Sequence, residues 1–281
     1  MEIRLGDDIT FGGNSKFQIT APLTGLTSPD IRTGDGLYAG VDGGYVSSQL
    51  YGFRDIVISG FYIGSTCEEA DNLREKLMRS LHIRYLYPVF ITTFSGKHYF
   101  TEGYITDRRS DITHPTSGVF QITIHCPDPI IYDGGDGINA DSAWFEQTFY
   151  KEGSGGFDIE YNIPVQWVAG QQLTSIENLG TVEAYPIITL KGIFTNPKIT
   201  NVTTNQFIEL DRTTTSSSDT IVINMKERVI TLNDVSIASD RTIDSVWWSL
   251  TSGENKIRLT TDSSSDVNFG TIKYKIGYQG I

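Results

Sequence analysis

Most of this chain consists of short runs in which apolar and polar residues alternate, but one segment repeats its apolar residues differently. In residues 66–81 the apolar positions recur every three or four residues, which predicts an amphipathic α-helix. Thr66 and Glu69 have the spacing of a capping box, in which each side chain accepts a hydrogen bond from a free backbone N–H at the helix start. We expect the apolar stripe to cover one face of a sheet, and it consists of Ala70, Leu73, Leu77 and Leu81.

That stripe has two alternatives, a partner helix or a membrane surface. Glu68, Glu69 and Asp71 lie near the helix start and Arg79 lies in its last turn. The polar face therefore mixes both signs of charge, whereas membrane-surface helices are rich in lysine and arginine on that face. Packing inside the protein remains the preferred interpretation.

The residues around this helix predict strands joined by turns. Residues 22–44 are rich in glycine, proline and aspartate, which is typical of a series of turns. Residues 82–94 and 97–109 have the pattern of two strands joined at Ser95 and Gly96, and thus of a β-hairpin. Further strands are expected at residues 55–64, where a glycine interrupts the alternation, and at residues 118–126.

A domain boundary is predicted near residue 132. Residues 128–142 combine prolines, glycines and acids and suit an exposed connection. Beyond them, short strand patterns alternate with polar turns, which favours a sandwich or jelly roll. The second domain is expected to begin with strands near residues 143–150 and 156–168. We therefore divide this mainly β protein into residues 1–132 and 133–281.

The charge balance narrows the function. The formal net charge is -12 and the pI is about 4.7. A general nucleic-acid binder needs a basic surface to displace counterions, and a binder of anionic membranes needs the same. We expect neither a specific nucleic-acid partner nor a membrane partner.

The cysteines and the absence of targeting signals in the sequence indicate the compartment in which the chain is expected to fold. Cys67 and Cys126 are the two cysteines, too few for a disulfide framework in a chain of 281 residues, so we expect free thiols and folding in a reducing cytoplasm. The N-terminal residues lack the basic and apolar regions of a signal peptide, and no segment has the apolar length of a membrane span.

The usual signatures of catalysis are missing from the sequence. There is no GxSxG, no P-loop and no dinucleotide fingerprint. The histidines form no HExxH motif and lie at no zinc-ligand spacing from a cysteine pair; they are His82, His98, His114 and His125. We predict no catalytic residue, no cofactor and no metal site.

One acidic loop is the best alternative to that expectation of no metal. Oxygen ligands on a glycine-rich loop suit Ca²⁺, but the spacing in YDGGDGINAD matches no EF-hand, so an ordinary acidic connection is preferred. The side chains concerned are Asp133, Asp136, Asn139 and Asp141.

Two adjacent tryptophans are candidates for ligand or partner contact. Neighbouring residues of a strand point to opposite faces, so one of Trp247 and Trp248 should face the core and the other should face away from it. An outward tryptophan can stack on a sugar or contact a protein, and the alternative is that a loop or a strand covers it.

Short strings in a fixed order along both predicted domains carry a resemblance to a known family. In the first domain they are Leu23–Leu26, Pro29–Arg32, Asp42–Gly44, Gly52–Ile56, Ile58–Gly60, Leu73-Arg74 with Leu77, and Asp128-Pro129 with Tyr132. In the second they are Asn178–Thr181, Ala184–Ile188, Gly192, Asn196-Pro197, Ser252–Asn255, Tyr274 and Tyr278. In this order they resemble the distal tail proteins of long-tailed bacteriophages and their prophages.

The resemblance implies an architecture and an assembly. The first domain would be a β-sandwich with one helix and a projecting β-hairpin, closing into a hexameric ring. The second would be a jelly-roll, galectin-like β-sandwich on the outside of that ring. Such a ring joins the tail tube to the tip or baseplate of the virion and lets DNA pass. Its implied partners are further copies, the tail tube protein, the tape measure protein, the tail-associated protein and receptor-binding proteins, with assembly in the host cytoplasm.

A ring subunit contacts its neighbour through two different patches. We take hairpin 83–109 as the candidate contact, with residues 53–64 as a second. The candidate residues are Arg84, Arg108, Arg109, Phe53 and Arg54. The arginines could pair with acids across the interface or could be solvated strand ends, because exposed ion pairs contribute little by themselves.

Three functions are compatible with these patterns. The preferred one is a structural tail-tip protein without catalysis. The second is a carbohydrate-binding module that recognises host cell-wall saccharide and aids adsorption. The third, a wall hydrolase, needs paired carboxylates in a cleft, and the sequence supplies acids without placing them.

Overall fold

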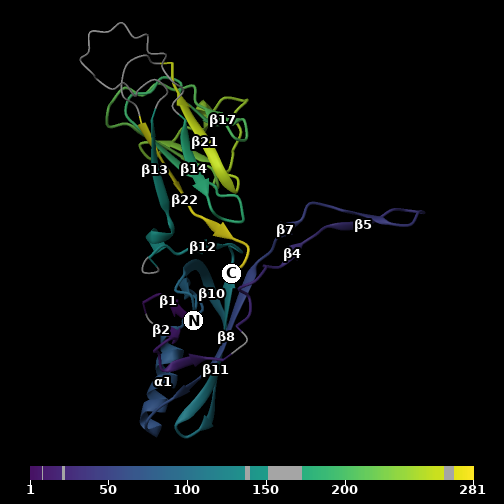
Figure 1. Ribbon diagram of the computed structural model, residues 1–281, viewed down its shortest axis with the longest axis vertical. Coiled ribbons are helices and arrows are strands. Elements are labelled where there is room, and N and C mark those ends of the chain that lie inside the picture. Colours follow the sequence, from purple (N-terminus) through teal and green to yellow (C-terminus); the bar gives the residue numbers. More distant parts are fainter. Residues whose placement is uncertain (8, 21–22, 137–139, 151–172, 263–268) are drawn as a thin grey trace. The chain divides into compact units, whose positions relative to one another are not determined.

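The computed structural model describes residues 1–7, 9–20, 23–136, 140–150, 173–262 and 269–281 (Figure 1). It divides into unit 1, comprising Met1–Ala143 and Gly277–Ile281, and unit 2, comprising Trp144–Ile276. The chain therefore leaves unit 1, forms unit 2 and returns to unit 1. The strand predicted at residues 156–168 lies outside the described residues.

Unit 1 is built on one large sheet. Its strands are β1 (Glu2–Leu5), β2 (Ile9–Gly12), β3 (Phe17–Ile19), β8 (Arg54–Ile63), β9 (Leu86–Thr92), β10 (His98–His114), β11 (Ser117–Cys126), β12 (Ile131–Asp133) and β23 (Gly277–Tyr278). In the described residues this is a nine-stranded sheet of order β11-β8-β3-β2-β1-β9-β10-β12-β23. Because β10 also pairs with β11, the sheet closes on itself; β2 and β3 pair in parallel.

Alternate residues of these strands fill the core of unit 1. On β8, Ile56 and Tyr62 point inward and are buried. Gly60 lies on the same face, and the Phe120 ring comes within 2.6 Å of the position that a Cβ on Gly60 would take. The glycine in the strand predicted at 55–64 therefore makes room for an aromatic side chain of β11.

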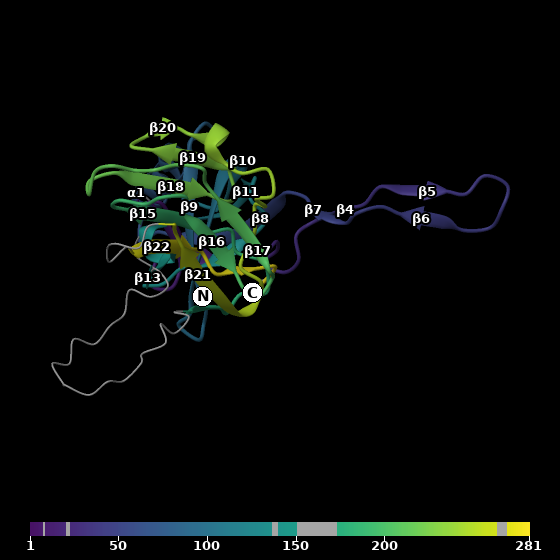
Figure 2. The ribbon, with the colours of Figure 1, turned by 90° about the horizontal axis from the view of Figure 1, so that it is seen from above.

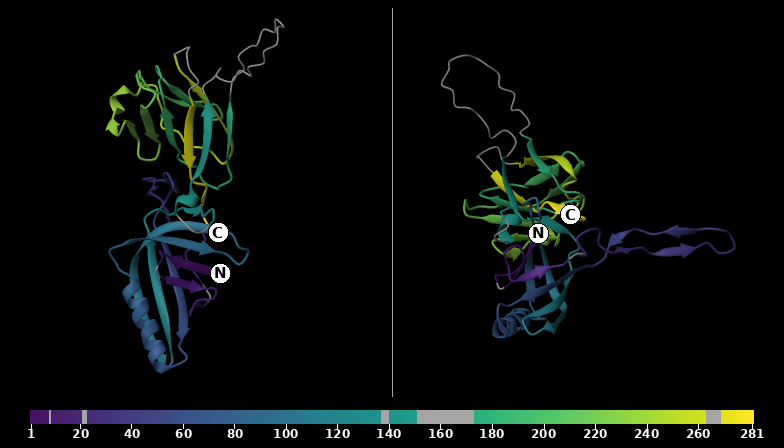
Figure 3. Two further views of the ribbon diagram at one scale, coloured as in Figure 1. Left: turned by 90° about the vertical axis from the view of Figure 1, so that its left-hand side faces the viewer. Right: turned by 60° about the horizontal axis from the view of Figure 1, so that its bottom comes forward.

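The predicted helix is confirmed as α1 (Cys67–Ser80). Thr66 Oγ1 accepts a hydrogen bond from the Glu69 N–H at 3.1 Å, and Glu69 Oε2 accepts one from the Ser65 N–H at 2.5 Å. The second bond thus reaches one residue further back than a capping box requires. The helix lies against the closed sheet (Figure 3) and contacts β8 and β11. Its stripe joins the core of unit 1 through Ala70, Leu73, Leu77 and Leu81.

A two-stranded ribbon connects β3 to β8 (Figures 1 and 2). Its strands are β4 (Ile31–Arg32), β5 (Asp35–Leu37), β6 (Gly44–Val46) and β7 (Leu50–Tyr51). β4 pairs with β7, and β5 pairs with β6. We call residues 30–51 the ribbon. The prediction of a series of turns is wrong for these residues, because strands of two or three residues broken by glycine show no alternation in the sequence.

The predicted hairpin exists as β9 and β10, with its turn at the predicted place. Thr93 N–H donates to the Lys97 carbonyl at 2.9 Å, and Gly96 has a positive φ of 80°. Both strands lie within the closed sheet, since β9 also pairs with β1. The projecting hairpin of this fold is therefore the ribbon.

Unit 2 is a sandwich of antiparallel strands. The six-stranded sheet contains, in order, β13 (Phe145–Tyr150), β22 (Phe269–Tyr274), β15 (Ile187–Lys191), β18 (Thr220–Asn224), β19 (Val229–Leu232) and β20 (Val235–Ser236). The four-stranded sheet contains β14 (Thr174–Asn178), β21 (Gly253–Thr260), β16 (Lys198–Asn201) and β17 (Gln206–Glu209). Both counts refer to the described residues, and inward residues of both sheets are buried, among them Ile188, Ile223, Ile199 and Leu259. The predicted mainly β architecture is confirmed.

Two short 3-10 helices complete the described elements. Ala140–Ala143 (η1) ends the first part of unit 1, and Ala238–Asp240 (η2) follows β20 in unit 2. Ala143 is buried against Phe90 and Phe100.

Candidate functional site

The ribbon exposes more apolar surface than a free segment of a soluble protein needs. Leu37 is 88% exposed, and the other exposed large apolar side chains of the ribbon are Ile31, Tyr38, Val41, Tyr45, Val46 and Leu50. A two-stranded hairpin alone is marginally stable in water. Full burial of a leucine or valine side chain is worth about 1.5–3 kcal/mol, so this segment gains greatly from a covering surface.

Both faces of the ribbon are apolar. Leu37 and Val46 lie on one face, because their partners Gly44 and Asp35 alternate with the pair Gly36–Tyr45. On the opposite face the Tyr45 ring lies over Gly36, whose added Cβ would meet it at 2.3 Å, and the Tyr38 and Tyr45 rings are 5.9 Å apart. The face of Leu37 and Val46 also carries the Asp35 carboxylate.

Arg54 stands at the root of the ribbon and is only 1% exposed. Its guanidinium donates to the carbonyls of Gly25 (2.6 Å), Thr27 (2.7 Å) and Pro129 (2.7 Å), and to that of Gln279. Desolvation lowers the pKa of Arg54. This residue was expected at the ring contact, but the structure places it inside unit 1, where it ties distant segments together.

The last residues of the chain fasten the same root. Ile281 N–H donates to the Leu26 carbonyl at 2.9 Å, and a Cβ on Gly280 would come within 2.7 Å of the Thr27 backbone. The segment that returns from unit 2 therefore holds one of the two chain segments that lead into the ribbon.

Arg108 also makes hydrogen bonds within unit 1. Its guanidinium donates to the Met78 carbonyl at 2.7 Å and to the Leu81 carbonyl. These carbonyls lie at the C-terminal end of α1, where a helix leaves acceptors unpaired and a cation is favourable. Arg108 thereby anchors the helix end on β10.

Arg84 and Arg109 are the exposed arginines of the predicted hairpin. Arg109 pairs with Asp107 at 2.9 Å. Within the described part of the chain Arg84 makes no ion pair, and it lies in the loop between α1 and β9. We define the Arg84 patch as Arg84 with its exposed apolar neighbours Ile83, Tyr85, Leu86 and Tyr104.

Phe53 is exposed beside the ribbon root. Its ring centroid lies 4.8 Å from that of His125, whose Nδ1 is 2.6 Å from Asp55 Oδ1. Asp55 and His125 are directly paired residues of β8 and β11. This aromatic ring thus stands on the outer face of the sheet next to a carboxylate.

The tryptophan pair of unit 2 is divided between inside and outside. Trp248 is buried, and its indole N–H has no hydrogen-bond partner among the described residues. Trp247 is partly exposed, with the Arg241 guanidinium 5.7 Å from its ring centroid. The geometry leaves Trp247 as the tryptophan that a ligand could reach.

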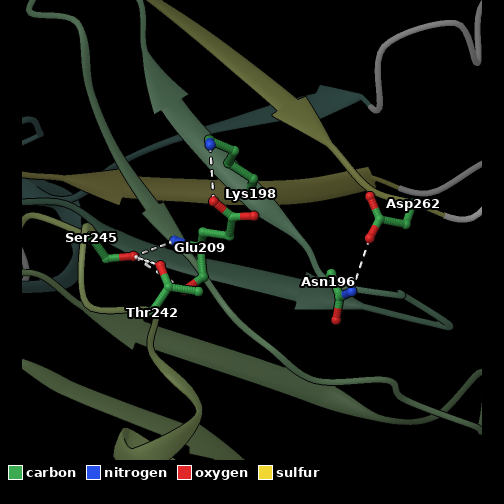
Figure 4. Close-up of polar contacts among 6 residues, drawn as sticks. All are labelled: Asn196, Lys198, Glu209, Thr242, Ser245 and Asp262. Carbon is green, nitrogen blue, oxygen red and sulfur yellow. Dashed lines mark hydrogen bonds and ion pairs between the residues drawn. The ribbon is translucent and has the colours of Figure 1, made fainter.

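Polar side chains line the outer face of β16 and β17 (Figure 4). Lys198 Nζ lies 2.9 Å from Glu209 Oε2 and 3.7 Å from the Phe207 ring centroid. Asn196 Nδ2 donates to Asp262 Oδ2 at 2.8 Å. Each of the two carboxylates is thus engaged by a neighbouring side chain.

A second set of bonds in Figure 4 fixes the chain segment beside β17. Ser245 Oγ accepts from the Glu209 N–H at 2.8 Å, and the Thr242 and Ser245 hydroxyls are 2.8 Å apart. These bonds extend the edge of the four-stranded sheet by side-chain contacts. These bonds hold Ser245 in place, and Trp247 follows it two residues further along the chain.

The two cysteines and the described residues of the acidic loop form no metal site. Among the described residues no group of three or more His, Cys, Asp or Glu side chains could hold a metal ion, and Asn139 lies outside them. Asp133 Oδ1 accepts from the Gly135 N–H at 2.9 Å. Cys67 is exposed, whereas burial raises the pKa of the Cys126 thiol to about 11.

None of the described helices combines the length and the apolar character that a bilayer-crossing helix requires.

The ribbon was missed at the sequence level although its residues carry a weak signal. Apolar residues flank the glycines in GDGLYAGV and GGYV, and this composition is unusual for an exposed turn. The pairing that turns these residues into strands joins Asp35 to Val46 and Ile31 to Tyr51. No local periodicity reveals such pairing, so the exposed apolar residues were the available clue.

Comparison with known proteins shows which proteins the chain is similar to. Residues 179–278 match the family described as the siphovirus-type tail component, C-terminal domain. The crystal structure of phage SPP1 Dit, described as a paradigm of the hub adsorption apparatus in phages infecting Gram-positive bacteria, matches with a TM-score of 0.64 and 15% identity, covering 91% of each chain. A chain of the phage P2 baseplate in its activated conformation with Ca matches with a TM-score of 0.45 and 11% identity, covering 96% of each chain.

No curated protein sequence matches the chain. The match to SPP1 Dit extends over both units and shows that the fold is shared. Residues 179–278 are thus similar to the siphovirus-type tail components, and the predicted resemblance to the distal tail proteins is confirmed.

Proposed function

We propose that copies of this chain assemble into a ring, most simply a hexamer, which joins the tail tube to the baseplate and leaves a channel for DNA. The family match over residues 179–278 and the fold shared with SPP1 Dit support a phage tail component, and the ring is our step beyond them. The observation that carries the proposal is the ribbon, whose two faces both expose large apolar side chains. A surface of this kind is complete only when another chain covers it.

A ring follows from the asymmetry of that surface. The ribbon is apolar and extended, whereas the rest of unit 1 presents a closed sheet and a helix. A contact between unlike patches is head-to-tail, and repeated head-to-tail contacts close into rings when the rotation allows it. The role is structural and involves no catalysis, and the ring would work at the virion tail tip after assembly in the host cytoplasm.

Other tail proteins would bind the two faces of the ring. We propose the tail tube protein, the tape measure protein, the tail-associated protein and receptor-binding proteins as its partners. With a net charge of -12 per copy, an acidic channel wall would repel passing DNA rather than retain it.

The test is assembly of the purified chain with and without the ribbon. Light scattering gives the mass, and negative-stain electron microscopy gives the symmetry. We expect six-fold rings for the intact chain and a folded monomer when residues 30–51 are replaced by a short glycine-serine linker. Rings that persist without the ribbon, or an intact chain that remains monomeric at every concentration, would contradict the proposal.

Saccharide binding by unit 2 is a second candidate function, favoured by one observation. Trp247 is partly exposed and supported by Arg241, so its ring offers a surface on which a sugar could stack. Binding of the whole protein to purified host cell walls should then weaken in Trp247→Ala and remain unchanged in Tyr185→Ala, a matched exposed aromatic of the same unit. Equal binding by both variants and the unaltered chain would exclude this role for Trp247.

A further inference from the structure

We infer that the ribbon of one copy docks on the Arg84 patch of the next copy. The inference rests on the proposed ring and names the surface that would receive the ribbon. It starts from two groups of exposed apolar side chains on unit 1, outside the ribbon and away from its root; Phe94, on the β9–β10 turn, is a further exposed apolar residue. One is the Arg84 patch, and the other, called here the acidic patch, comprises Ile63, Ile112 and Val119 with Asp111.

The charge of the ribbon decides between the Arg84 patch and the acidic patch. Residues 30–51 contain three aspartates, Asp30, Asp35 and Asp42, against one arginine, Arg32, which gives a net charge of -2. Within the described residues none of these three aspartates makes an ion pair. An interface that buries this ribbon therefore needs a cation opposite at least one carboxylate.

The Arg84 patch supplies that cation together with apolar cover. Arg84 is exposed and, in the described part of the chain, without an ion-pair partner. Ile83 and Tyr85 flank it in sequence, and Leu86 stands opposite Tyr104 in the pairing of β9 with β10. Arg84 thus stands among exposed apolar residues of the chain and carries a positive charge that no described residue pairs.

The acidic patch offers the opposite charge. Val119 is paired with Asp111 across β11 and β10, and Asp111 is exposed and makes no ion pair among the described residues. The nearest arginine in the pairing of these strands, Arg109, is already held by Asp107 at 2.9 Å. Docking an acidic ribbon there would place like charges together, which disfavours the contact.

The ribbon matches the Arg84 patch on one face in particular. Leu37, Val46 and Asp35 share that face, so two apolar side chains accompany one carboxylate. Seated on the patch, Leu37 and Val46 would cover Ile83, Tyr85 and Leu86, and Asp35 would meet Arg84. The tyrosine face of the ribbon would remain for a third surface.

The first experiment is a charge exchange read out by ring assembly. Arg84→Asp and Asp35→Arg are each expected to raise the midpoint concentration of assembly by about tenfold, because rim charge pairs contribute on this order. The double variant restores the pair and should return to within about threefold of the unaltered chain. Lys97→Asp, an exposed cation on the β9–β10 turn, is the matched control and should change little.

The second experiment locates the contact directly. In a Cys67→Ser background, Leu37→Cys combined with Tyr85→Cys should give cross-linked oligomers under mild oxidation. Leu37→Cys with Val119→Cys should stay uncross-linked. Cys126 is buried and stays in place.

The outcomes separate this inference from the ring itself. Rings without cross-links and without charge rescue would refute the Arg84 patch and leave the ring intact. Cross-links through Val119 would move the docking site to the acidic patch. An unaltered chain that forms no rings, together with double-cysteine variants that form no cross-links, would overturn both proposals.

Discussion

Helix α1 and the ribbon are both additions to the same closed sheet, and both carry apolar side chains, but they differ in what covers them. The stripe of α1 is buried by its own unit, with Leu77 only 1% exposed. The ribbon leaves Leu37 88% exposed and has apolar side chains on both faces. The apolar residues of α1 serve the fold and are covered within the chain, whereas those of the ribbon are left uncovered and support our proposal of a contact with a second chain.

The largest effect is expected at the ribbon root. Replacing the buried Arg54 by methionine leaves four carbonyls without their shared donor, so we expect the free energy of unfolding of unit 1 to fall by about 4 kcal/mol. Chemical denaturation measures this fall. Arg84→Met, at an exposed arginine, should change stability by less than about 0.5 kcal/mol. If the two variants lost the same free energy of unfolding, Arg54 would contribute no more to the stability of the fold than the exposed Arg84 does.

The next largest effect is expected in helix α1, whose apolar stripe is covered by its own unit. Leu77→Ala removes a buried leucine of α1 from the core and should lower the free energy of unfolding by about 3 kcal/mol. Thermal or chemical unfolding of the isolated protein gives the value. A loss below about 1 kcal/mol would show that the helix is loosely held and that its burial matters less than the geometry indicates.

A smaller effect is expected at the start of the same helix. Thr66→Ala deletes the hydroxyl that accepts from the Glu69 N–H, and such caps are worth about 1 kcal/mol. Thr66→Ser keeps the hydroxyl and serves as the control. The difference between the two variants in chemical denaturation should approach that value, and identical curves would argue against the cap.

The smallest effect on stability is expected on the ribbon. Leu37→Ser removes an exposed side chain, so the free energy of unfolding of the monomer should change by no more than about 0.5 kcal/mol. The same variant should weaken assembly, which light scattering follows. If the free energy of unfolding of the monomer instead falls by about 2 kcal/mol or more, Leu37 is covered within its own chain. The contrast between a covered helix and an uncovered ribbon would then be wrong.

The sequence predicted those elements whose signals are local. The helix repeats its apolar residues over several turns and begins at Thr66, and the turn after Thr93 is marked by Gly96. Alternation along 55–64 and 118–126 predicted the strands that the structure shows as β8 and β11. Such patterns lie within a few residues of one another and need no knowledge of the rest of the chain.

Features that depend on distant segments could not be predicted in this way. The sheet closes because β10 reaches β11 as well as β9. Arg54 is buried because carbonyls from residues 25, 27, 129 and 279 converge on it. A charged residue beside an exposed phenylalanine has the appearance of a surface site in the sequence, and only the fold distinguishes it from Arg84.

The tryptophan pair shows the same limit in miniature. Alternation predicts that Trp247 and Trp248 face opposite ways, and the structure buries Trp248. Which of the two is inside depends on the register of the segment that follows Ser245, and that register is set by bonds to Glu209 on another strand.

Unit 2 begins after Ala143 and ends at Ile276, between two stretches of unit 1. The strands of unit 1 nearest these junctions, β12 and β23, are paired with each other, Ile131 with Tyr278 and Tyr132 with Gly277. The chain thus leaves and re-enters unit 1 close to a single ladder of hydrogen bonds. Exchange of the whole inserted module for another would keep this ladder, so unit 1 has the form of a reusable base that can accept a different unit 2.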